Sequence, residues 1–197
     1  MSLLLESIYL KDGGFRNLSY HQSRMENSVR EIYQEEFPKR LVDLFSSRLV
    51  PSSGLYKTRV IYDTEIRKVE FVPYQSRPVQ SVKLINDSTV SYHHKFLDRS
   101  LLEKLFGQRS AADDILIVRN GWITDTCYAN VIFKRNDQWF TPESYLLKGT
   151  MRQSLLDAGR IKEADINVSN YHDYQSFKLI NSMLGMDGPE IPISSIL

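Results

Sequence analysis

The first third of the chain alternates hydrophobic and polar residues with two different periods. Residues 3–10 predict a strand that ends at the turn-forming run Asp12-Gly13-Gly14. A helix is expected from about Tyr20 to Phe37, because its apolar residues recur at helical spacing and Pro38 then breaks it. The apolar stripe of this helix consists of Met25, Val29, Ile32, Tyr33 and Phe37. The chain therefore opens with a strand followed by an amphipathic helix.

Shorter elements follow, up to a candidate domain boundary. A second short helix is expected near residues 41–45, where Leu41, Leu44 and Phe45 provide its apolar positions. Residues 55–62 and 66–72 predict a pair of strands, since hydrophobic and charged side chains alternate there with a period of two. We place the boundary between two domains at Arg77-Pro78.

The rest of the chain is richer in predicted strands. Asn120-Gly121 is the strongest hairpin signal in the sequence, and Asn136-Asp137 marks a further turn. The expected strands cover residues 82–85, 115–118, 131–133 and 138–141. The expected helices cover residues 101–106, closed by Gly107, and a segment from Thr150 to Gly159. The pattern predicts an α+β protein, with a small domain of residues 1–78 and a larger strand-rich domain of residues 79–197.

Composition and charge exclude some classes of function. The 197 residues are 42% hydrophobic and 25% charged, and the formal net charge is +1. These values give no reason to expect binding to nucleic acid or to an anionic membrane. No apolar stretch approaches the roughly 20 residues of a membrane helix, and the N-terminal run has no basic leader. With a single cysteine, Cys127, no internal disulfide can form, so we expect a soluble, cytoplasmic protein.

Spacing rules for metal and nucleophile sites yield little. His93 and His94 are adjacent, so on a strand they would point to opposite faces and would not share a metal. The sequence has no familiar glycine-rich phosphate loop and no nucleophile-elbow motif. The residues taken one by one therefore indicate a soluble α+β protein without a metal site, and no chemistry beyond that.

A series of motifs, in order and spacing, resembles one enzyme family. It runs through His21-Gln22-Ser23-Arg24, residues 94–99, 113–116, 120–130, 139–142 and 147–152, and Ile180-Asn181-Ser182-Met183. The series is similar to the class IV aminotransferases, the fold-type IV pyridoxal phosphate enzymes, and spans nearly the whole chain. The resemblance implies a fold like that of D-amino-acid aminotransferase, in which pyridoxal 5'-phosphate lies between two domains.

The resemblance assigns the cofactor's covalent link and its ring nitrogen to two residues. Lys95 would hold pyridoxal phosphate as a Schiff base and act as the catalytic residue. Such a lysine must be neutral to attack an aldehyde, and burial beside other cations favours the neutral form. Asp125 stands where the family usually has glutamate, the carboxylate that pairs with the pyridine nitrogen. That pairing keeps the ring protonated, which makes it a better electron sink.

The phosphate of the cofactor is expected at three segments. Arg24 resembles the family's phosphate-binding arginine, whose guanidinium can make two parallel hydrogen bonds. Gly149-Thr150-Met151 stands at a helix start, where backbone N–H groups and the helix dipole favour an anion. Asn181-Ser182 resembles the last cofactor loop, in which the serine would add a hydroxyl. Taken alone, these segments are also typical of an exposed helical arginine, a plain helix start and a polar turn.

The substrate pocket is less clearly marked. Arg59 lies on a strand expected to line the pocket, where it would bind a substrate carboxylate in two-point fashion. Lys57 has the same side-chain parity, and Arg77 is a further option; a half-exposed sheet arginine is the alternative interpretation. His94, next to the expected Schiff-base lysine, is interpreted as structural.

The chain departs from the family pattern in several places. We expect a shortened N-terminus and no closing helix after Ile193. Leu5-Glu6-Ser7 falls where the family has an aromatic-Glu-Thr run, so Leu5 brings no tyrosine hydroxyl to the cofactor. Asp98 replaces a common asparagine. These departures leave the cofactor motifs intact and pare back the substrate pocket.

Three functions fit the resemblance. The first is the family's lyase reaction, which converts 4-amino-4-deoxychorismate to 4-aminobenzoate and pyruvate for folate synthesis; residues 95–99 and 149–152 look most like this branch. A class IV aminotransferase of branched-chain or D-amino-acid type would use the same Lys95 and Asp125 on a small amino acid. A catalytically silent cofactor-binding homologue is the third. The expected partners are a small amine or amino-acid substrate and a second copy of the chain in a homodimer.

Overall fold

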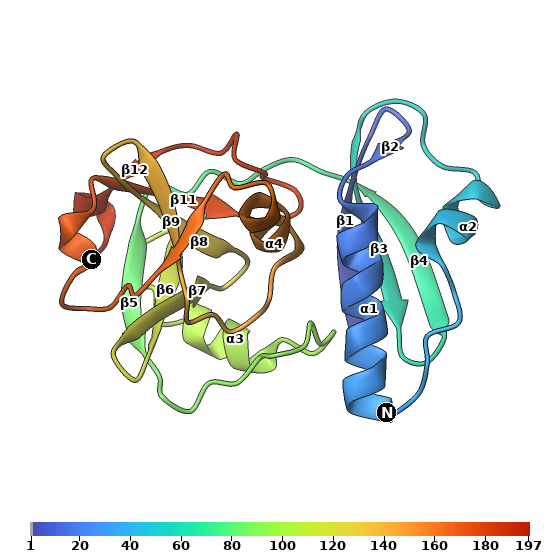
Figure 1. Ribbon diagram of the computed structural model, residues 1–197, viewed down its shortest axis with the longest axis horizontal. Helices are drawn as coiled ribbons and strands as arrows, with labels where there is room; N and C mark the ends of the chain where they lie inside the picture. Colours follow the sequence, from blue (N-terminus) through green and yellow to red (C-terminus); the bar gives the residue numbers. More distant parts are fainter. Residues whose placement is uncertain (1) are drawn as a thin grey trace. The chain divides into compact units, whose positions relative to one another are not determined.

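The computed structural model describes residues 2–197, which divide into two compact units (Figure 1). The first unit contains the chain up to Ser76 together with His94–Asp98. The second contains Arg77–His93 and Arg99–Leu197. The sequence prediction assigned Lys95 to the second domain, and the structure corrects this. The segment returns to the first unit because Leu5 N–H donates to Lys95 O at 2.9 Å.

The first unit is a four-stranded antiparallel sheet with helices on one face (Figure 1). Its strands are β1 (Leu4–Lys11), β2 (Gly14–Phe15), β3 (Leu55–Tyr62) and β4 (Ile66–Pro73), in the order β2-β1-β3-β4. Its helices are α1 (Leu18–Tyr33) and α2 (Leu41–Ser46). Side chains of alternate strand positions, such as Ile8 and Val60, pack against Met25 and Val29 of α1. The period-two and helical patterns of the sequence thus meet in one core.

Helix α1 ends one turn earlier than the apolar stripe predicts. Gln34 adopts a left-handed conformation with φ of 58°, and its N–H donates to Arg30 O, which closes the helix. Phe37 is nevertheless buried, and its ring lies edge-on to Tyr62 at 5.7 Å between centroids. The periodicity identified a core residue correctly and placed it in the wrong element.

The second unit is built on a longer mixed sheet in the order β10-β9-β8-β7-β6-β5. Strand β11 pairs with β8 and with the short β12. The strands are β5 (Val82–Asn86), β6 (Asp114–Arg119), β7 (Trp122–Thr126), β8 (Asn130–Arg135), β9 (Gln138–Pro142), β10 (Lys162–Ala164), β11 (Ser176–Ile180) and β12 (Ile191–Pro192). The helices are α3 (Ser100–Phe106), α4 (Thr150–Asp157) and the 3-10 turns η1 (Tyr171–Asp173) and η2 (Ile193–Ser195). The result is the predicted α+β architecture.

Both hairpin turns predicted in this unit are confirmed. Asn120 and Gly121 join β6 to β7 with positive φ angles of 53° and 83°. Asn136 and Asp137 join β8 to β9 with φ of 50° and 60°. Two successive residues with positive φ match the twist of an antiparallel pair. These turns set the pairing of β6 with β7 and of β8 with β9, while β7 and β8 pair separately, at Asp125 and Asn130.

The two faces of β8 pack against different partners. Val131 and Phe133 point into the main core, where Phe133 lies near Phe177 and Tyr174. Ile132 points the other way and packs with Met151 and Leu155 of α4. Strand β8 therefore holds α4 in place, including the N-terminus of that helix. Among residues 2–197, no helix combines the length and the apolar character needed to cross a membrane.

Candidate active site

In the first unit, the predicted phosphate residue Arg24 is bound to a buried acid. Glu6 lies on the face of β1 covered by α1, and its side chain is fully buried. Arg24 donates from Nε to Glu6 Oε1 at 2.9 Å and from Nη2 to Oε2. His21, one helical turn before Arg24, places Nδ1 2.6 Å from Glu6 Oε2. Two side chains of α1 are thus held by one carboxylate.

The charges of this cluster are set by burial and by each other. Burial alone would raise the pKa of Glu6, but the Arg24 guanidinium and the hydrogen bond from His21 outweigh it and hold the pKa at about 2. Burial lowers the pKa of His21, and the charges of Arg24 and Lys95 lower it further, against the influence of Glu6. Glu6 is therefore an anion, and the lowered pKa of His21 favours the neutral ring, whose Nδ1 faces the Glu6 carboxylate.

Lys95 lies in the same unit as Arg24. Its segment runs beside β1: Phe96 forms a bridge with Leu4, and Leu97 N–H donates to Leu3 O at 2.8 Å. Lys95 is half-buried, and its positive charge acts on the pKa of His21. The structure thus brings the predicted Schiff-base lysine and the predicted phosphate arginine to one buried histidine.

Arg59 lies on the face of the first sheet that α1 does not cover. Its neighbours Thr58 and Val60 are buried on the helix side, so alternation turns Arg59 the other way. Arg59 Nη1 donates to Glu70 Oε2 on β4 at 2.9 Å, and Lys68 Nζ contacts the other Glu70 oxygen at 2.8 Å. The side chain is 31% exposed, which leaves part of it accessible to a ligand. Lys57, two residues earlier on β3, lies on the same face of the sheet as Arg59. Arg77 belongs to the second unit.

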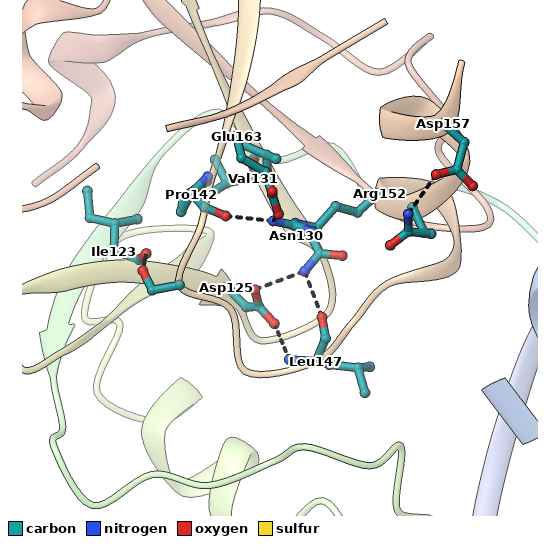
Figure 2. Close-up of polar contacts among 12 residues, drawn as sticks. Ile123, Asp125, Asn130, Val131, Pro142, Leu147, Arg152, Asp157 and Glu163 are labelled. Carbon is teal, nitrogen blue, oxygen red and sulfur yellow. Dashed lines mark hydrogen bonds and ion pairs between the residues drawn. The ribbon is translucent and has the colours of Figure 1, made fainter. Parts of the chain in front are cut away.

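In the second unit, Asp125 is a buried carboxylate held from both sides (Figure 2). Asn130 Nδ2 donates to Oδ1 at 2.9 Å, and Leu147 N–H donates to Oδ2 at 2.9 Å. Burial raises the pKa of Asp125 to about 6, although these donors and the charge of Arg152 oppose the rise. Asp125 is therefore mostly ionised above pH 6 and remains a hydrogen-bond acceptor.

The predicted phosphate segment stands at the N-terminus of α4. Gly149 is the N-cap and no side chain caps this end of the helix, whose first turn also contains no acidic residue. Thr150 and Met151 form the first two helical positions, and both are buried. A helix end of this kind attracts anions through its N–H groups and its dipole.

The Asn181-Ser182 segment follows directly after β11. Asn181 Oδ1 accepts hydrogen bonds from the N–H groups of Met183 and Leu184, each at 2.9 Å, while Nδ2 donates to Tyr128 O at 3.2 Å. The Asn181 side chain therefore shapes its own loop and joins it to the loop between β7 and β8. Ser182 is buried beside it.

Sequence reasoning gave no role to four polar residues that organise these clusters. They are Glu6, His21, Asn130 and Arg152. The available signal for Glu6 is an acid at a strand position that alternation turns inward, and Asn130 lies within the motif segment of residues 120–130. Arg152 is almost completely buried; its Nη2 donates to Pro142 O at 2.9 Å and to Glu163 Oε1 at 2.7 Å. Partners so distant in sequence leave no signal in local periodicity.

The residues present fit pyridoxal phosphate. Asp125 offers a buried, oriented acceptor that suits a protonated pyridine nitrogen. The N-terminus of α4 and the guanidinium of Arg24 are both suited to a phosphate. Lys95 supplies the amine, in a segment fixed by backbone hydrogen bonds to β1.

Comparisons with known proteins agree with this chemistry. A model of the class IV amino-transferase family matches residues 3–196. An uncharacterized protein of Haemophilus influenzae is 34% identical over 186 residues, which are 93% of this chain and 98% of that protein. A Schizosaccharomyces pombe protein, provisionally named aminodeoxychorismate lyase, is 28% identical over an alignment of 195 residues, gaps included, that covers 88% of this chain and 83% of that protein.

A solved structure matches the fold closely. It is a protein of Haemophilus somnus 129pt that carries the provisional name 4-amino-4-deoxychorismate lyase. The two chains superpose with a TM-score of 0.88 at 32% sequence identity, and the match covers 94% of this chain and 98% of the other.

Proposed function

This chain belongs to the class IV aminotransferase family and is a pyridoxal phosphate-dependent enzyme of fold type IV, and we propose that it is the lyase that converts 4-amino-4-deoxychorismate to 4-aminobenzoate and pyruvate. The observation that carries this choice of reaction is the likeness, over nearly the full length of both chains, to the Haemophilus somnus structure of that provisional name. The similarly named Schizosaccharomyces pombe relative supports it.

The proposed cofactor contacts are the residues that the family resemblance assigned. Lys95 would hold the cofactor covalently, Asp125 would keep a proton on its ring nitrogen, and Arg24 with the start of α4 would hold its phosphate. When bound, pyridoxal phosphate supplies an electron sink that stabilises the negative charge left on carbon as bonds break. The Glu6 carboxylate orients Arg24, because it receives both Nε and Nη2 of that side chain.

Lys95 is the proposed general acid and base. Aromatisation of the substrate ring requires loss of the proton on the carbon that carries the amino group. The enolpyruvyl group of the substrate leaves when its ether C–O bond to the ring breaks. It becomes pyruvate when its methylene carbon gains a proton. Lys95 Nζ would take the first proton and deliver one to the second carbon, which balances the reaction without another proton carrier. The lowered pKa of His21 favours its neutral form, so this ring adds little positive charge of its own.

Substrate binding is proposed at the uncovered face of the first sheet. The substrate carries two carboxylates, and a guanidinium binds a carboxylate through two parallel hydrogen bonds. Arg59 is the proposed contact, with Glu70 holding its side chain in place from the adjacent strand. Lys57, on the same face, and Arg77 are the alternative cations.

We further propose that the enzyme works as a homodimer in the cytoplasm. Strand β4 lies at the edge of its sheet, which supports pairing with another chain. The one cysteine of the sequence, Cys127, is a buried free thiol, which suits a reducing compartment. Sedimentation of the purified protein as a monomer alone would exclude the dimer.

Product analysis tests the proposed reaction. The purified protein, supplied with pyridoxal phosphate, is incubated with 4-amino-4-deoxychorismate, and 4-aminobenzoate and pyruvate are measured. A parallel incubation offers branched-chain and D-amino acids with a 2-oxo acid acceptor. The proposal predicts both products in the first incubation in equal amounts. Amino-group transfer in the second, with no 4-aminobenzoate in the first, would identify a transaminase, and a protein that binds cofactor without either reaction would be a silent homologue.

A further inference from the structure

Asn130 stands where three elements of the second unit meet. It is the first residue of β8, opposite Asp125 of β7 and opposite Ile180 of β11 in the strand registers. Gly149, at the start of α4, also lies close to the Asn130 side chain. Two predicted cofactor residues of this unit, Asp125 and Gly149, therefore lie against one side chain that is itself buried.

Both N–H groups of the Asn130 side-chain amide donate hydrogen bonds. Nδ2 donates one hydrogen to Asp125 Oδ1 at 2.9 Å and the other to Leu147 O at 3.0 Å (Figure 2). Leu147 in turn donates its N–H to the other oxygen of Asp125. Asn130, Asp125 and Leu147 thus close a ring of three hydrogen bonds, which leaves the carboxylate no freedom to rotate without breaking one of them.

Gly149 leaves the space that Asn130 occupies. A Cβ at position 149 would lie 1.9 Å from Asn130 Oδ1 and 3.1 Å from Asn130 Cγ. The backbone of Gly149, at φ −69° and ψ 138°, is one that other residues adopt easily. Glycine is therefore needed here for room and not for conformational freedom. The start of α4 and the carboxylate of Asp125 are coupled through the Asn130 side chain between them.

We propose that Asn130 is a positioning residue, seated in the space beside Gly149, that fixes the Asp125 carboxylate as the acceptor for the cofactor's ring nitrogen. This inference rests on the proposed function, because it presupposes that the cofactor binds. Asn130 touches no reacting atom and acts only through Asp125. A mere packing role would require its volume; the positioning role requires its N–H donors.

An isosteric substitution separates these two roles. Asn130→Asp keeps the shape and places a second carboxylate against Asp125, so that the two acids compete for one proton. Asn130→Ser is smaller and uncharged and loses the amide donors. Thr141→Val is the matched control: it removes a buried hydrogen bond to Val131 O, at 3.0 Å, in the same sheet and leaves both hydrogen bonds to Asp125 in place.

The test titrates each folded variant with pyridoxal phosphate and records the dissociation constant and the visible absorbance band. The proposal predicts that Asn130→Asp weakens binding about tenfold or more and shifts the band, while Thr141→Val binds as the wild type does. If far-UV circular dichroism shows that Asn130→Asp is unfolded, Asn130→Ser is titrated in its place. The same weaker binding and shifted absorbance band are then expected. Wild-type affinity and an unshifted band in the folded variant would overturn the inference. Failure of the wild-type protein to bind the cofactor would instead overturn the proposed function.

Discussion

Arg24 of α1 donates from Nε and Nη2 to the two oxygens of Glu6 on β1, a carboxylate that is fully buried. Glu6 lies on the face of β1 that α1 covers, at a strand position that a hydrophobic residue would normally occupy. Its position suggests that the first unit depends on Glu6 for its stability as well as for the orientation of Arg24.

Replacing Glu6 by Gln should destabilise the protein by about 3 kcal/mol, because Arg24 and His21 then lose a buried anionic partner. The free energy of unfolding from urea titration measures this. Glu65→Gln is the control, since Glu65 pairs with Arg67 at 3.2 Å on the surface and should contribute no more than about 1 kcal/mol. If both variants lost the same free energy of unfolding, the buried pair would stabilise the protein no more than the surface pair.

The same carboxylate predicts how stability depends on acid. The pKa of Glu6 is lowered from 4.5 to about 2, so the folded protein holds this group ionised where the unfolded chain protonates it. Its contribution is complete above pH 4.5 and is lost as the pH falls toward 2. We expect the stability difference between wild type and Glu6→Gln to shrink over that range in urea titrations at successive pH values. A difference that stays constant from pH 6 to pH 3 would contradict the assigned ionisation.

Asp125→Asn should impair catalysis far more than folding. The neutral amide cannot keep a proton on the cofactor's ring nitrogen, and we expect kcat for 4-aminobenzoate formation to fall roughly 100-fold or more. Asp125→Glu restores the carboxylate that the family usually has, and it should retain more activity than the amide variant. Steady-state kinetics with the cofactor in excess checks both, and unchanged kcat in Asp125→Asn would remove this residue from the mechanism.

Arg59→Gln should raise KM about tenfold or more while kcat changes little, because the lost contact binds the substrate carboxylate before and during the reaction alike. Arg67→Gln is the control: Arg67 bonds to Asp63 at 2.8 Å and has no proposed contact with substrate. If KM is unchanged in Arg59→Gln, Lys57→Gln and Arg77→Gln are measured next.

The sequence predicts most of the fold because its strands and helices have clear periods. It fails where a boundary depends on tertiary contacts. Gln34 ends α1 by adopting a left-handed conformation, which a glutamine in the sequence does not predict. No strand was predicted at residues 176–180, yet they form β11, because pairing with β8 supplies the stability that five residues lack alone.

The candidate site shows the same division. Motif order pointed to Lys95, Asp125 and Arg24, but it could not show which partners hold them. Helix packing brings Glu6 to Arg24, and strand register brings Asn130 to Asp125. Likewise, Lys95 belongs with the first unit because of a backbone hydrogen bond to β1, an interaction with no counterpart in residue type.

The most direct test of the account is to locate the covalent link to the cofactor. The purified protein is mixed with pyridoxal phosphate, its absorbance spectrum is recorded, and borohydride is added before proteolysis and mass mapping. We predict that reduction abolishes the visible band and leaves the cofactor's mass on Lys95 alone, with no label in Lys95→Arg. Label on another lysine, or none at all, would contradict the central claim.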